Sequence, residues 1–496
     1  MNNLVNWQYL STGIPGLDDV LGGGLRAHRV YLVEGEPGTG KTATGLQFLM
    51  EGARRGERVL YITLAESAAE LRSIADSHGW DLSGIAIHEV ITPDDALLGG
   101  DQFTIFHPSE IEMSDMLKRI VAAVEEQQPT RVVLDSLSEL QLLAESPLRY
   151  RRQVLALKNY FAQLQCTVIL LDDRSAAAGD LQVRSIAHGV IQLEFNVKDY
   201  GTERRRLRIV KYRGQAFSGG LHDYTLGRGG LVVHPRLVAS ESRSISTRKQ
   251  LSSSLPQLDL LLGGGLEEGT STLLLGPPGT GKSSLAAQFV SAACDAGLPA
   301  AMFLFEESTS NMLHRADALN MDLRGYLAAS TLTIQQVDPA ELTPGQFSSH
   351  MRAAVLAGVK VVVIDSLNGY LQAVPDERFL MTHLHEVLTY LGQHKVVTIM
   401  IGVQQGMLGG SLSSTLDASY IADNVVMLRY FELDGEIRQA VSVFKKRGSA
   451  HERTIRAFSM SAKGIHVGET LRGYRGILSG VPTPTFPASA DSHHHG

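Results

Sequence analysis

The sequence predicts an α/β protein made of two tandem domains of one fold, each a mostly parallel sheet flanked by helices. Three observations lead to this prediction. A long segment of the chain is repeated once in the same order. Each copy carries a glycine-rich loop between an apolar run and a helical stretch. Short unbroken apolar runs alternate with helical stretches, which is typical of parallel strands covered by helices on both faces.

The repeat keeps a constant spacing through its first part. Residues 13–25, GIPGLDDVLGGGL, recur as residues 254–266, SLPQLDLLLGGGL. The offset of 241 (254 − 13) equals the offset between the two glycine-rich loops (276 − 35). Two copies with so long a period indicate a tandem duplication and exclude a solenoid or a propeller. Later motifs recur in the same order. VVLDS at 132–136 corresponds to VVIDS at 362–366, and KYRG at 211–214 corresponds to KKRG at 445–448.

Length and composition provide apolar material for two separate cores. The chain has 496 residues, of which 44% are hydrophobic and 20% are charged, so each domain would hold about 230 residues. A Ser/Arg-rich stretch follows the first copy, and a Pro/Ser-rich stretch ends the chain. We therefore expect a first domain at 1–238, a linker at 239–250, a second domain at 251–481 and a disordered tail at 482–496.

The first half shows the alternation of elements in detail. Apolar runs predict strands near Val30–Glu34, Val59–Leu64, Arg131–Leu134, Thr167–Leu171, Gly189–Phe195 and Arg206–Val210. Helical periodicity predicts helices near Ala43–Arg55, Ala68–His78, Glu112–Gln127 and Arg149–Gln165. The last strands are separated by turns rather than by helices, so we expect them to extend the sheet in antiparallel order at one edge.

The sequence favours a cytoplasmic protein without a membrane span. It has no run of about 18 apolar residues, and its first ten residues lack the basic start and apolar core of a signal peptide. Its two cysteines, Cys166 and Cys294, fall in different domains, which is typical of reduced thiols that pack in the interior.

The charge balance bears on the partners of the protein. The formal net charge is −7 and the sequence pI is about 6.2, whereas a protein that grips a nucleic-acid backbone usually shows a basic surplus. Nucleic acid is therefore not an expected partner. The dense basic run at 203–208, ERRRLR, is interpreted as a solvated hairpin or a subunit contact in preference to a nucleic-acid patch.

The glycine-rich loops both fit the pattern G-x-x-x-x-G-K-[ST], as GEPGTGKT at 35–42 and GPPGTGKS at 276–283. In this pattern the backbone N–H groups surround the phosphates of a nucleotide, the lysine adds a positive charge, and the last hydroxyl binds Mg²⁺. Two nucleotide sites are therefore predicted. The candidate nucleotide-binding residues are Gly35, Gly38, Thr39, Gly40, Lys41 and Thr42 in the first half, and Gly276, Gly279, Thr280, Gly281, Lys282 and Ser283 in the second.

Aspartates at the ends of apolar runs complete two candidate metal sites. Phosphoryl transfer needs charge neutralisation on the phosphates, which Mg²⁺ commonly provides. Asp135 and Asp365 each end a strand-like run, where they could hold the metal through water. The candidate Mg²⁺ ligands are therefore Thr42 with Asp135 and Ser283 with Asp365.

Glutamates after the second strand of each half are candidate catalytic residues. Ala65 and Glu66 in the first half are answered by Glu306 and Glu307 in the second, again at an offset of 241 (307 − 66). A carboxylate here could orient the nucleophile or receive its proton. The alternative is that these residues are solvated charges at a strand end.

These residues together resemble the KaiC-like branch of the RecA-type ATPases. The resemblance covers about residues 8–480, including the lead-in at 22–25, both phosphate loops, the Glu positions, the Asp-Ser strand ends and the two Lys-x-Arg-Gly segments. It implies two tandem RecA-like P-loop domains, ATP and Mg²⁺ as ligands, and a homohexamer with ATP between neighbouring chains. Four residues would reach the γ-phosphate held by the adjacent subunit, the alternative being a structural charge on a strand: Lys211, Arg213, Lys445 and Arg447.

The resemblance also implies what each domain does. In the family's clock protein the first domain hydrolyses ATP, and the second phosphorylates its own Ser and Thr. Two residues depart from that pattern: Ala65 replaces the first Glu of a Glu-Glu pair, and Tyr420 replaces one of two acceptors. Ser419 matches the other acceptor and is the candidate phosphosite, with further hydroxyls at 411–415.

The function implied is that of an ATPase and Ser/Thr autokinase in signalling or circadian-type timing. The resemblance allows a KaiB-like protein partner on the first domain and gives no support for a KaiA-like one. Two alternatives stay open at this point. One is a RecA/DnaB-like motor on single-stranded DNA, against which the acidic net charge counts. The other is a scaffold that binds nucleotide with little catalysis.

Overall fold

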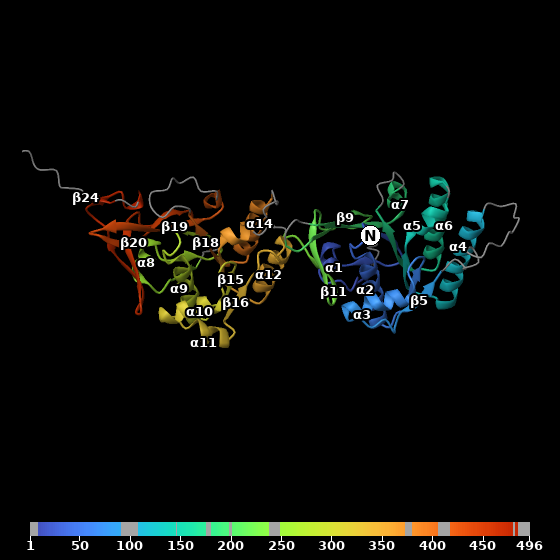
Figure 1. The fold of residues 1–496 in the computed structure, drawn as a ribbon, viewed down its shortest axis with the longest axis horizontal. Coiled ribbons are helices and arrows are strands. Elements are labelled where there is room, and N and C mark those ends of the chain that lie inside the picture. Colours follow the sequence, from blue (N-terminus) through green and yellow to red (C-terminus); the bar gives the residue numbers. More distant parts are fainter. Residues whose placement is uncertain are drawn as a thin grey trace, which may run out of the picture. The chain divides into compact units, whose positions relative to one another are not determined.

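The computed structural model describes residues 8–90, 108–144, 146–174, 180–197, 201–237, 249–372, 379–404, 417–479 and 482–484. The chain divides into two compact units, Met1–Arg236 and Leu237–Gly496. Each unit contains one nine-stranded sheet with helices packed on its faces (Figure 1). The fold class predicted from the sequence is therefore confirmed.

The sheet of the first unit is parallel over most of its width. Its strand order is β11-β10-β9-β8-β3-β7-β6-β4-β5, with β3 and β7 in the middle. The six strands from β8 to β5 pair in parallel, and β9, β10 and β11 continue the sheet in antiparallel order, as expected. The strands are β3 (Val30–Gly35), β4 (Val59–Thr63), β5 (Ala86–Glu89), β6 (Arg131–Asp135), β7 (Thr167–Asp173), β8 (Gly189–Asn196), β9 (Arg204–Tyr212), β10 (His222–Gly227) and β11 (Gly230–His234).

Alternate side chains of the central strands pack into two apolar cores, one on each face of the sheet. Tyr31 and Val33 of β3 belong to a core with α2 (Lys41–Arg54) and α3 (Ala68–His78). Val30 and Leu32 point to the other face, because successive strand side chains alternate. They join a core with α4 (Pro108–Gln127), α5 (Leu137–Leu143) and α6 (Pro147–Gln163). The short helices α1 (Leu17–Val20) and α7 (Asp180–Ile186) complete the unit.

The second unit repeats this arrangement. Its strand order is β16-β15-β17-β18-β14-β19-β20-β21-β22, parallel from β16 to β19 and antiparallel beyond. The strands are β14 (Ser271–Gly276), β15 (Ala300–Leu304), β16 (Leu332–Gln336), β17 (Val361–Asp365), β18 (Val397–Val403), β19 (Asn424–Leu433), β20 (Glu436–Lys446), β21 (Ile455–Ser461) and β22 (Gly464–Thr470).

The helices of the second unit also form two layers. One core contains α9 (Lys282–Asp295), α10 (Thr309–Ala318) and α11 (Leu323–Ala328). The other contains α12 (Pro344–Leu356), α13 (Leu367–Gln372) and α14 (Leu380–Gln393). Smaller elements are α8 (Pro256–Leu261), the pairs β1 (Tyr9–Leu10) with β2 (Leu25–Arg26), β12 (Gln250–Leu251) with β13 (Leu266–Glu267), β23 (Tyr474–Arg475) with β24 (Thr483–Pro484), and the 3-10 turns η2 (Asp417–Tyr420) and η3 (Ile477–Ser479).

The repeated glycine lead-in has a structural reason. Gly24 and Gly265 adopt φ angles of 110° and 129°, which only glycine adopts readily. A Cβ atom at Gly24 would lie 2.4 Å from the carbonyl oxygen of Leu10, and one at Gly265 would lie 2.3 Å from that of Leu251. Because glycine has no Cβ atom, β1 can pair with β2 in the first unit and β12 with β13 in the second without a steric clash.

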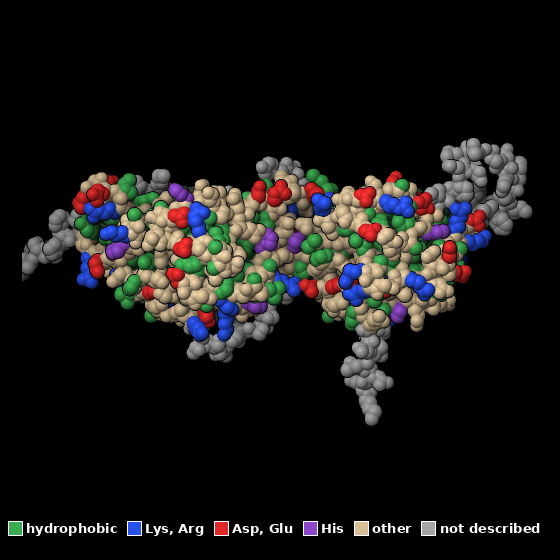
Figure 2. Space-filling model, turned by 90° about the horizontal axis from the view of Figure 1, so that it is seen from below, with side chains coloured by type: hydrophobic (Ala, Val, Ile, Leu, Met, Phe, Trp, Pro, Cys, Tyr) green, Lys and Arg blue, Asp and Glu red, His purple; other side chains and the backbone are tan. Residues whose placement is uncertain are grey.

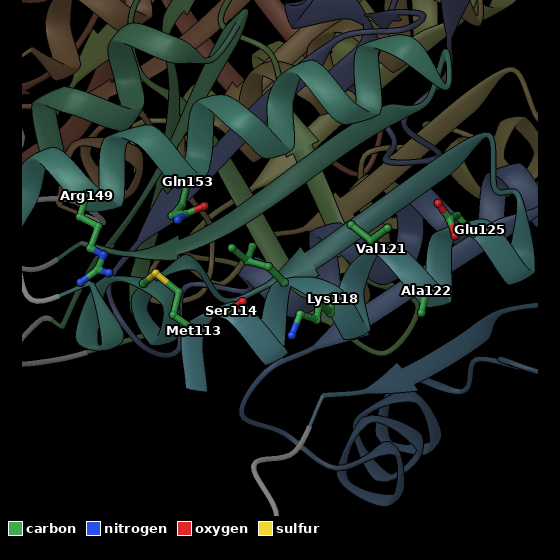
Figure 3. A pocket seen from close by; sticks show the side chains of 9 residues that line it. Met113, Ser114, Lys118, Val121, Ala122, Glu125, Arg149 and Gln153 are labelled. Atoms are coloured by element: carbon green, nitrogen blue, oxygen red, sulfur yellow. The ribbon is translucent and has the colours of Figure 1, made fainter. Parts of the chain in front are cut away.

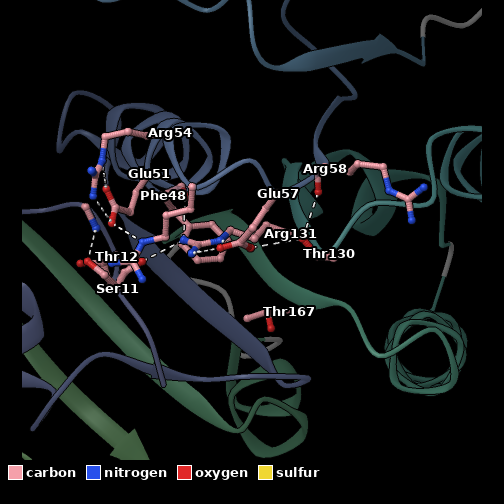
Figure 4. A network of polar contacts seen from close by, with 12 residues as sticks. Ser11, Thr12, Phe48, Glu51, Arg54, Glu57, Arg58, Thr130, Arg131 and Thr167 are labelled. Carbon is pink, nitrogen blue, oxygen red and sulfur yellow. Dashed lines mark hydrogen bonds and ion pairs between the residues drawn. The ribbon is translucent and has the colours of Figure 1, made fainter. Parts of the chain in front are cut away.

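A buried arginine distinguishes the first unit from the second. The Arg131 side chain is fully buried and forms two hydrogen bonds of 2.8 and 2.7 Å with the carboxylate of Glu57 (Figure 4). It also donates to the carbonyl oxygens of Ser11 and Phe48. The matching strand position of the second unit is Val361. The first core thus includes an ion pair where the second has an aliphatic side chain.

Both cysteines are buried thiols. Burial raises the pKa of Cys166 and of Cys294 to about 11. In the described part of the chain, no helix is both long enough and apolar enough to cross a membrane.

Candidate nucleotide-binding sites

Both glycine-rich loops lie at the carboxyl end of a central strand and lead directly into a helix. The first joins β3 to α2, and the second joins β14 to α9. Gly40 and Gly281 occupy the helix N-caps with φ angles of 92° and 91°. The amino end of a helix exposes N–H groups that bind anions, so each loop is built to receive phosphate. Thr39 and Thr280 brace the loops by donating to the carbonyl oxygens of Glu36 and Pro277.

The loop lysines fold back onto their own loops. Lys41 Nζ donates to the carbonyl oxygens of Gly35 (2.9 Å) and Glu36 (3.0 Å). Lys282 Nζ makes the matching bonds to Gly276 (2.8 Å) and Pro277 (2.7 Å). Burial lowers the pKa of Lys282 to about 8, although the carboxylates of Asp365 and Glu306 oppose this shift. Both ammonium groups therefore lie beside the place where phosphates are expected.

A hydroxyl and an aspartate, which the sequence suggested as metal ligands, lie beside each loop; Asp135 is partly buried and Asp365 is buried. Thr42 Oγ1 donates to Asp135 Oδ2 over 3.1 Å. Ser283 lies close enough to Asp365 to lower the pKa of that carboxyl, against the larger effect of burial. Burial raises the pKa of both aspartates. Asp365 Oδ2 is buried and has no hydrogen-bond partner among the described residues. A carboxylate oxygen without a hydrogen-bond partner can bind a cation. The hydroxyl and carboxylate oxygens at these positions are donors that suit Mg²⁺.

The candidate catalytic glutamates have different surroundings. Glu307 is bound by Arg315 through two hydrogen bonds of 2.6 and 2.7 Å, and Glu306 accepts one from Ser366 Oγ over 2.7 Å. Glu66 Oε2 is buried without a hydrogen-bond partner among the described residues. Burial, and then the nearby Asp135, raise the pKa of Glu66.

Four neighbours of these sites were not predicted from the sequence. Tyr61 donates to Asp135 Oδ2 over 2.5 Å, and Asp173 forms an ion pair of 2.6 Å with Lys41. Arg315 and Ser366 contact the second pair of glutamates. The aspartate could have been found, because it ends an apolar run in the way that Asp135 does. Ser366 belongs to the repeated Asp-Ser strand end, whereas Tyr61 and Arg315 carry no pattern of their own.

The two Lys-x-Arg segments lie toward the opposite end of the sheet from their own loops. Lys211 pairs through Val190 with Leu32, three residues before the first glycine of the loop. At about 3.3 Å per residue, that is roughly 10 Å along the strand. Its Nζ donates to the carbonyl oxygens of Arg184 and Ser185.

The other members of this set are arranged in the same way. Arg213 donates to the carbonyl oxygen of Ser185, Lys445 to those of Ser419 and Ala422, and Arg447 to that of Tyr420. None of these contacts involves the glycine-rich loop of the same unit.

The candidate phosphosite shares this distant end. Ser419 lies in η2, just before the amino end of β19, and is exposed. Its carbonyl oxygen is held by Lys445 over 2.8 Å. The further hydroxyls at 411–415 lie outside the described residues.

The basic run after Glu203 is built into the first unit. Arg204 is 4% exposed, so the interpretation as a solvated hairpin is wrong for this residue. Arg205 packs over the ring of Phe195 and donates to the carbonyl oxygen of Gly38 at the loop, and Arg206 pairs with Asp223. On the face drawn in Figure 2, basic and acidic side chains are interspersed.

One hollow of the first unit lies away from the loops. It has a volume of about 530 Å³ and lies between α4 and α6, where Met113, Leu117 and Gln153 line it (Figure 3). These helices cover the face opposite α2. A second hollow of about 480 Å³ lies beside α2 and includes Trp80.

Comparisons with known proteins cover almost the whole chain. The family model described as "ATPase: KaiC" matches residues 10–238 and 251–472. The chain is 28% identical over 489 residues to the circadian clock protein KaiC3 of Synechocystis sp., covering 97% of this chain and 96% of that protein. It is 27% identical over 477 residues to the circadian clock oscillator protein KaiC of Parathermosynechococcus lividus, covering 95% and 87%. Over 487 residues it is 28% identical to the KaiC of Synechococcus elongatus, covering 96% and 92%.

Proposed function

Because the chain belongs to the KaiC family of ATPases, we propose that it is a homohexameric, Mg²⁺-dependent ATPase and Ser/Thr autokinase of the cytoplasm. The proposed role is signalling or circadian-type timing, in line with the names of its relatives. The observation that supports the proposal is the repeated phosphate loop: in each copy a lysine donates to its own loop, and a hydroxyl lies beside an aspartate. The proposed domains are 1–238 and 251–481, joined by a linker and followed by a tail.

Each domain holds its own nucleotide and metal in this proposal. The loop N–H groups and the lysine bind the phosphates of ATP. Thr42 with Asp135, and Ser283 with Asp365, hold Mg²⁺. When bound, the metal neutralises charge on the phosphates. In the first domain Glu66 orients the attacking water, because its unpaired buried oxygen can accept a proton or hydrogen bond from it.

Ring assembly supplies the remaining residues. The Lys-x-Arg segments lie roughly 10 Å along the strand from the loop of their own unit. In a ring, the same segments reach the loop of an adjacent copy, where Lys211, Arg213, Lys445 and Arg447 bind the γ-phosphate. Hydrolysis then depends on assembly.

The same geometry makes autophosphorylation a reaction between neighbouring chains. Ser419 lies toward the distant end of its own sheet, so its hydroxyl meets the nucleotide of an adjacent second domain. The Ser419 oxygen forms a bond to the γ-phosphorus, and the bond from that phosphorus to the β–γ bridging oxygen breaks. The hydroxyl proton passes to a carboxylate of the Glu306–Glu307 pair, and ADP leaves.

Two alternatives are weaker. A nucleotide-binding scaffold does not need the unpaired carboxylate of Glu66. A DNA motor is disfavoured because the basic run is packed against the first unit. A KaiB-like protein is a proposed partner only by analogy with the relatives.

One experiment tests the proposal. The purified chain is incubated with Mg·ATP, and its native mass, ADP release and phosphosites are measured. We expect a hexamer, ADP, and phosphate on Ser419. Lys41→Ala should shift the hexamer toward monomers, whereas Lys282→Ala should remove the phosphate. Nucleotide binding without ADP or phosphate would favour the scaffold.

A further inference from the structure

The lysine of the first loop is engaged by an acid that the second loop lacks. Lys41 Nζ contacts Asp173 Oδ1 over 2.6 Å in addition to its two loop carbonyls. The Lys41 side chain is 10% exposed and the Asp173 side chain 47% exposed. The ammonium is thus enclosed, while the carboxylate has solvent on one side and can move away.

The second unit provides an internal comparison. Gly35 pairs with Asp173 across β3 and β7, and Gly276 pairs with Val403 across β14 and β18. Val403 therefore stands where Asp173 stands in the first unit. Lys282 keeps both loop carbonyls and forms no ion pair with a described residue. At this register position the first unit has a carboxylate and the second has an aliphatic side chain.

This carboxylate competes with a nucleotide for the same cation. A lysine of this loop type binds the β- and γ-phosphates. Asp173 occupies one side of that ammonium, so bound phosphates and the carboxylate would be two anions beside one cation. Like charges at this range repel strongly in a partly buried site. The repulsion is larger for a triphosphate than for a diphosphate, because only the triphosphate places a γ-phosphate beside the lysine.

We propose that Asp173 is a specificity-determining residue of the first nucleotide site, which weakens binding of ATP more than binding of ADP. The inference rests on the proposed function of that site. It gives the two domains different nucleotide preferences: the second site retains ATP better, and the first exchanges toward ADP. Asp173 acts through Lys41 and takes no part in bond making.

The test measures affinity in the full-length chain. Lys282→Ala leaves the first site as the main nucleotide site, and Mg²⁺ with ADP or with the β,γ-imido analogue of ATP is titrated by calorimetry. We expect Asp173→Asn, which keeps the size and removes the charge, to strengthen binding of the ATP analogue about three- to tenfold. Binding of ADP should change less. The reciprocal variant, Val403→Asp in a Lys41→Ala background, should weaken the ATP analogue relative to ADP.

The outcomes separate this inference from the proposed function. If both nucleotides bind and the ratio of their affinities is unchanged in Asp173→Asn and in Val403→Asp, Asp173 does not set the preference. If neither nucleotide binds to the first site of the Lys282→Ala chain, the proposed site is itself wrong and the inference fails with it. Circular dichroism and melting curves confirm that each variant is folded, and the reciprocal variant provides a second test.

Discussion

Arg315 binds both carboxylate oxygens of Glu307, with hydrogen bonds of 2.6 and 2.7 Å. The position of Arg315 in the first domain is occupied by Ile74, at the constant offset of 241 (315 − 74). Glu66 therefore has no cation of this kind, and one of its oxygens is buried without a hydrogen-bond partner among the described residues. The two domains thus hold the same glutamate in opposite electrostatic settings.

The first prediction concerns the base of the second domain. Both oxygens of Glu307 accept hydrogen bonds from Arg315, whereas Glu306 is exposed and accepts one bond from Ser366. Glu306→Gln should lower phosphorylation of Ser419 by about a hundredfold or more, and Glu307→Gln by less than about tenfold. Quantitative phosphopeptide mapping measures both. Equal losses would show that the pair acts as a unit.

The second prediction concerns Glu66. In the Lys282→Ala background, Glu66→Gln should lower ATP turnover by about ten- to a hundredfold, because it removes the charge that orients water. Burial raises the pKa of this carboxyl above its ordinary value of 4.5. The acid limb of the rate profile should therefore lie above pH 4.5, and it should disappear in the glutamine variant. Turnover that is insensitive to this change would require another water-orienting group.

The sequence allowed site residues to be proposed where they belong to short motifs of consecutive residues. Each phosphate loop is a pattern of eight consecutive residues, so Lys41 and Lys282 could be identified directly. The aspartates at strand ends were found because apolar runs mark the carboxyl edge of a parallel sheet.

What could not be predicted depends on which strands become neighbours. Asp173 meets Lys41 only because β7 pairs with β3, and Tyr61 meets Asp135 only because β4 pairs with β6. Strands β5, β10 and β11 were not predicted, because these short strands lack a long apolar run. Arg204 was misread because a run of arginines resembles a solvated surface, whereas its side chain is buried.

The third prediction concerns the buried ion pair of the first core. Arg131→Val should destabilise the first domain by about 3 kcal/mol, because Glu57 and two carbonyl oxygens lose their donor. Adding Glu57→Leu installs the residues found at these positions in the second unit, Val361 and Leu298. The double variant should recover part of the loss. Both tryptophans, Trp7 and Trp80, belong to the first half, so urea unfolding followed by tryptophan fluorescence reports on that domain.

The last prediction is a pH dependence that His188 gives to the first domain. His188 Nδ1 accepts the backbone N–H of Val30 over 3.1 Å, at the start of the strand that leads to the loop. In the second domain the carboxylate of Asp423 accepts from Ser271 at the same place. Burial, and then the nearby cations Lys158 and Arg29, lower the pKa of His188 from 6.5 to about 4.

Between pH 6.5 and pH 4 the unfolded chain therefore binds a proton that the folded domain excludes. The free energy of unfolding must then fall as the pH falls through this window, by about 1 to 2 kcal/mol for a partly exposed ring. Urea unfolding at pH 7, 6 and 5, followed by tryptophan fluorescence, measures the loss. In His188→Asn the amide oxygen takes the place of Nδ1 and does not titrate, so this variant should lose less stability than the parent across the same range. Identical pH dependence in the two proteins would show that His188 is not the group responsible.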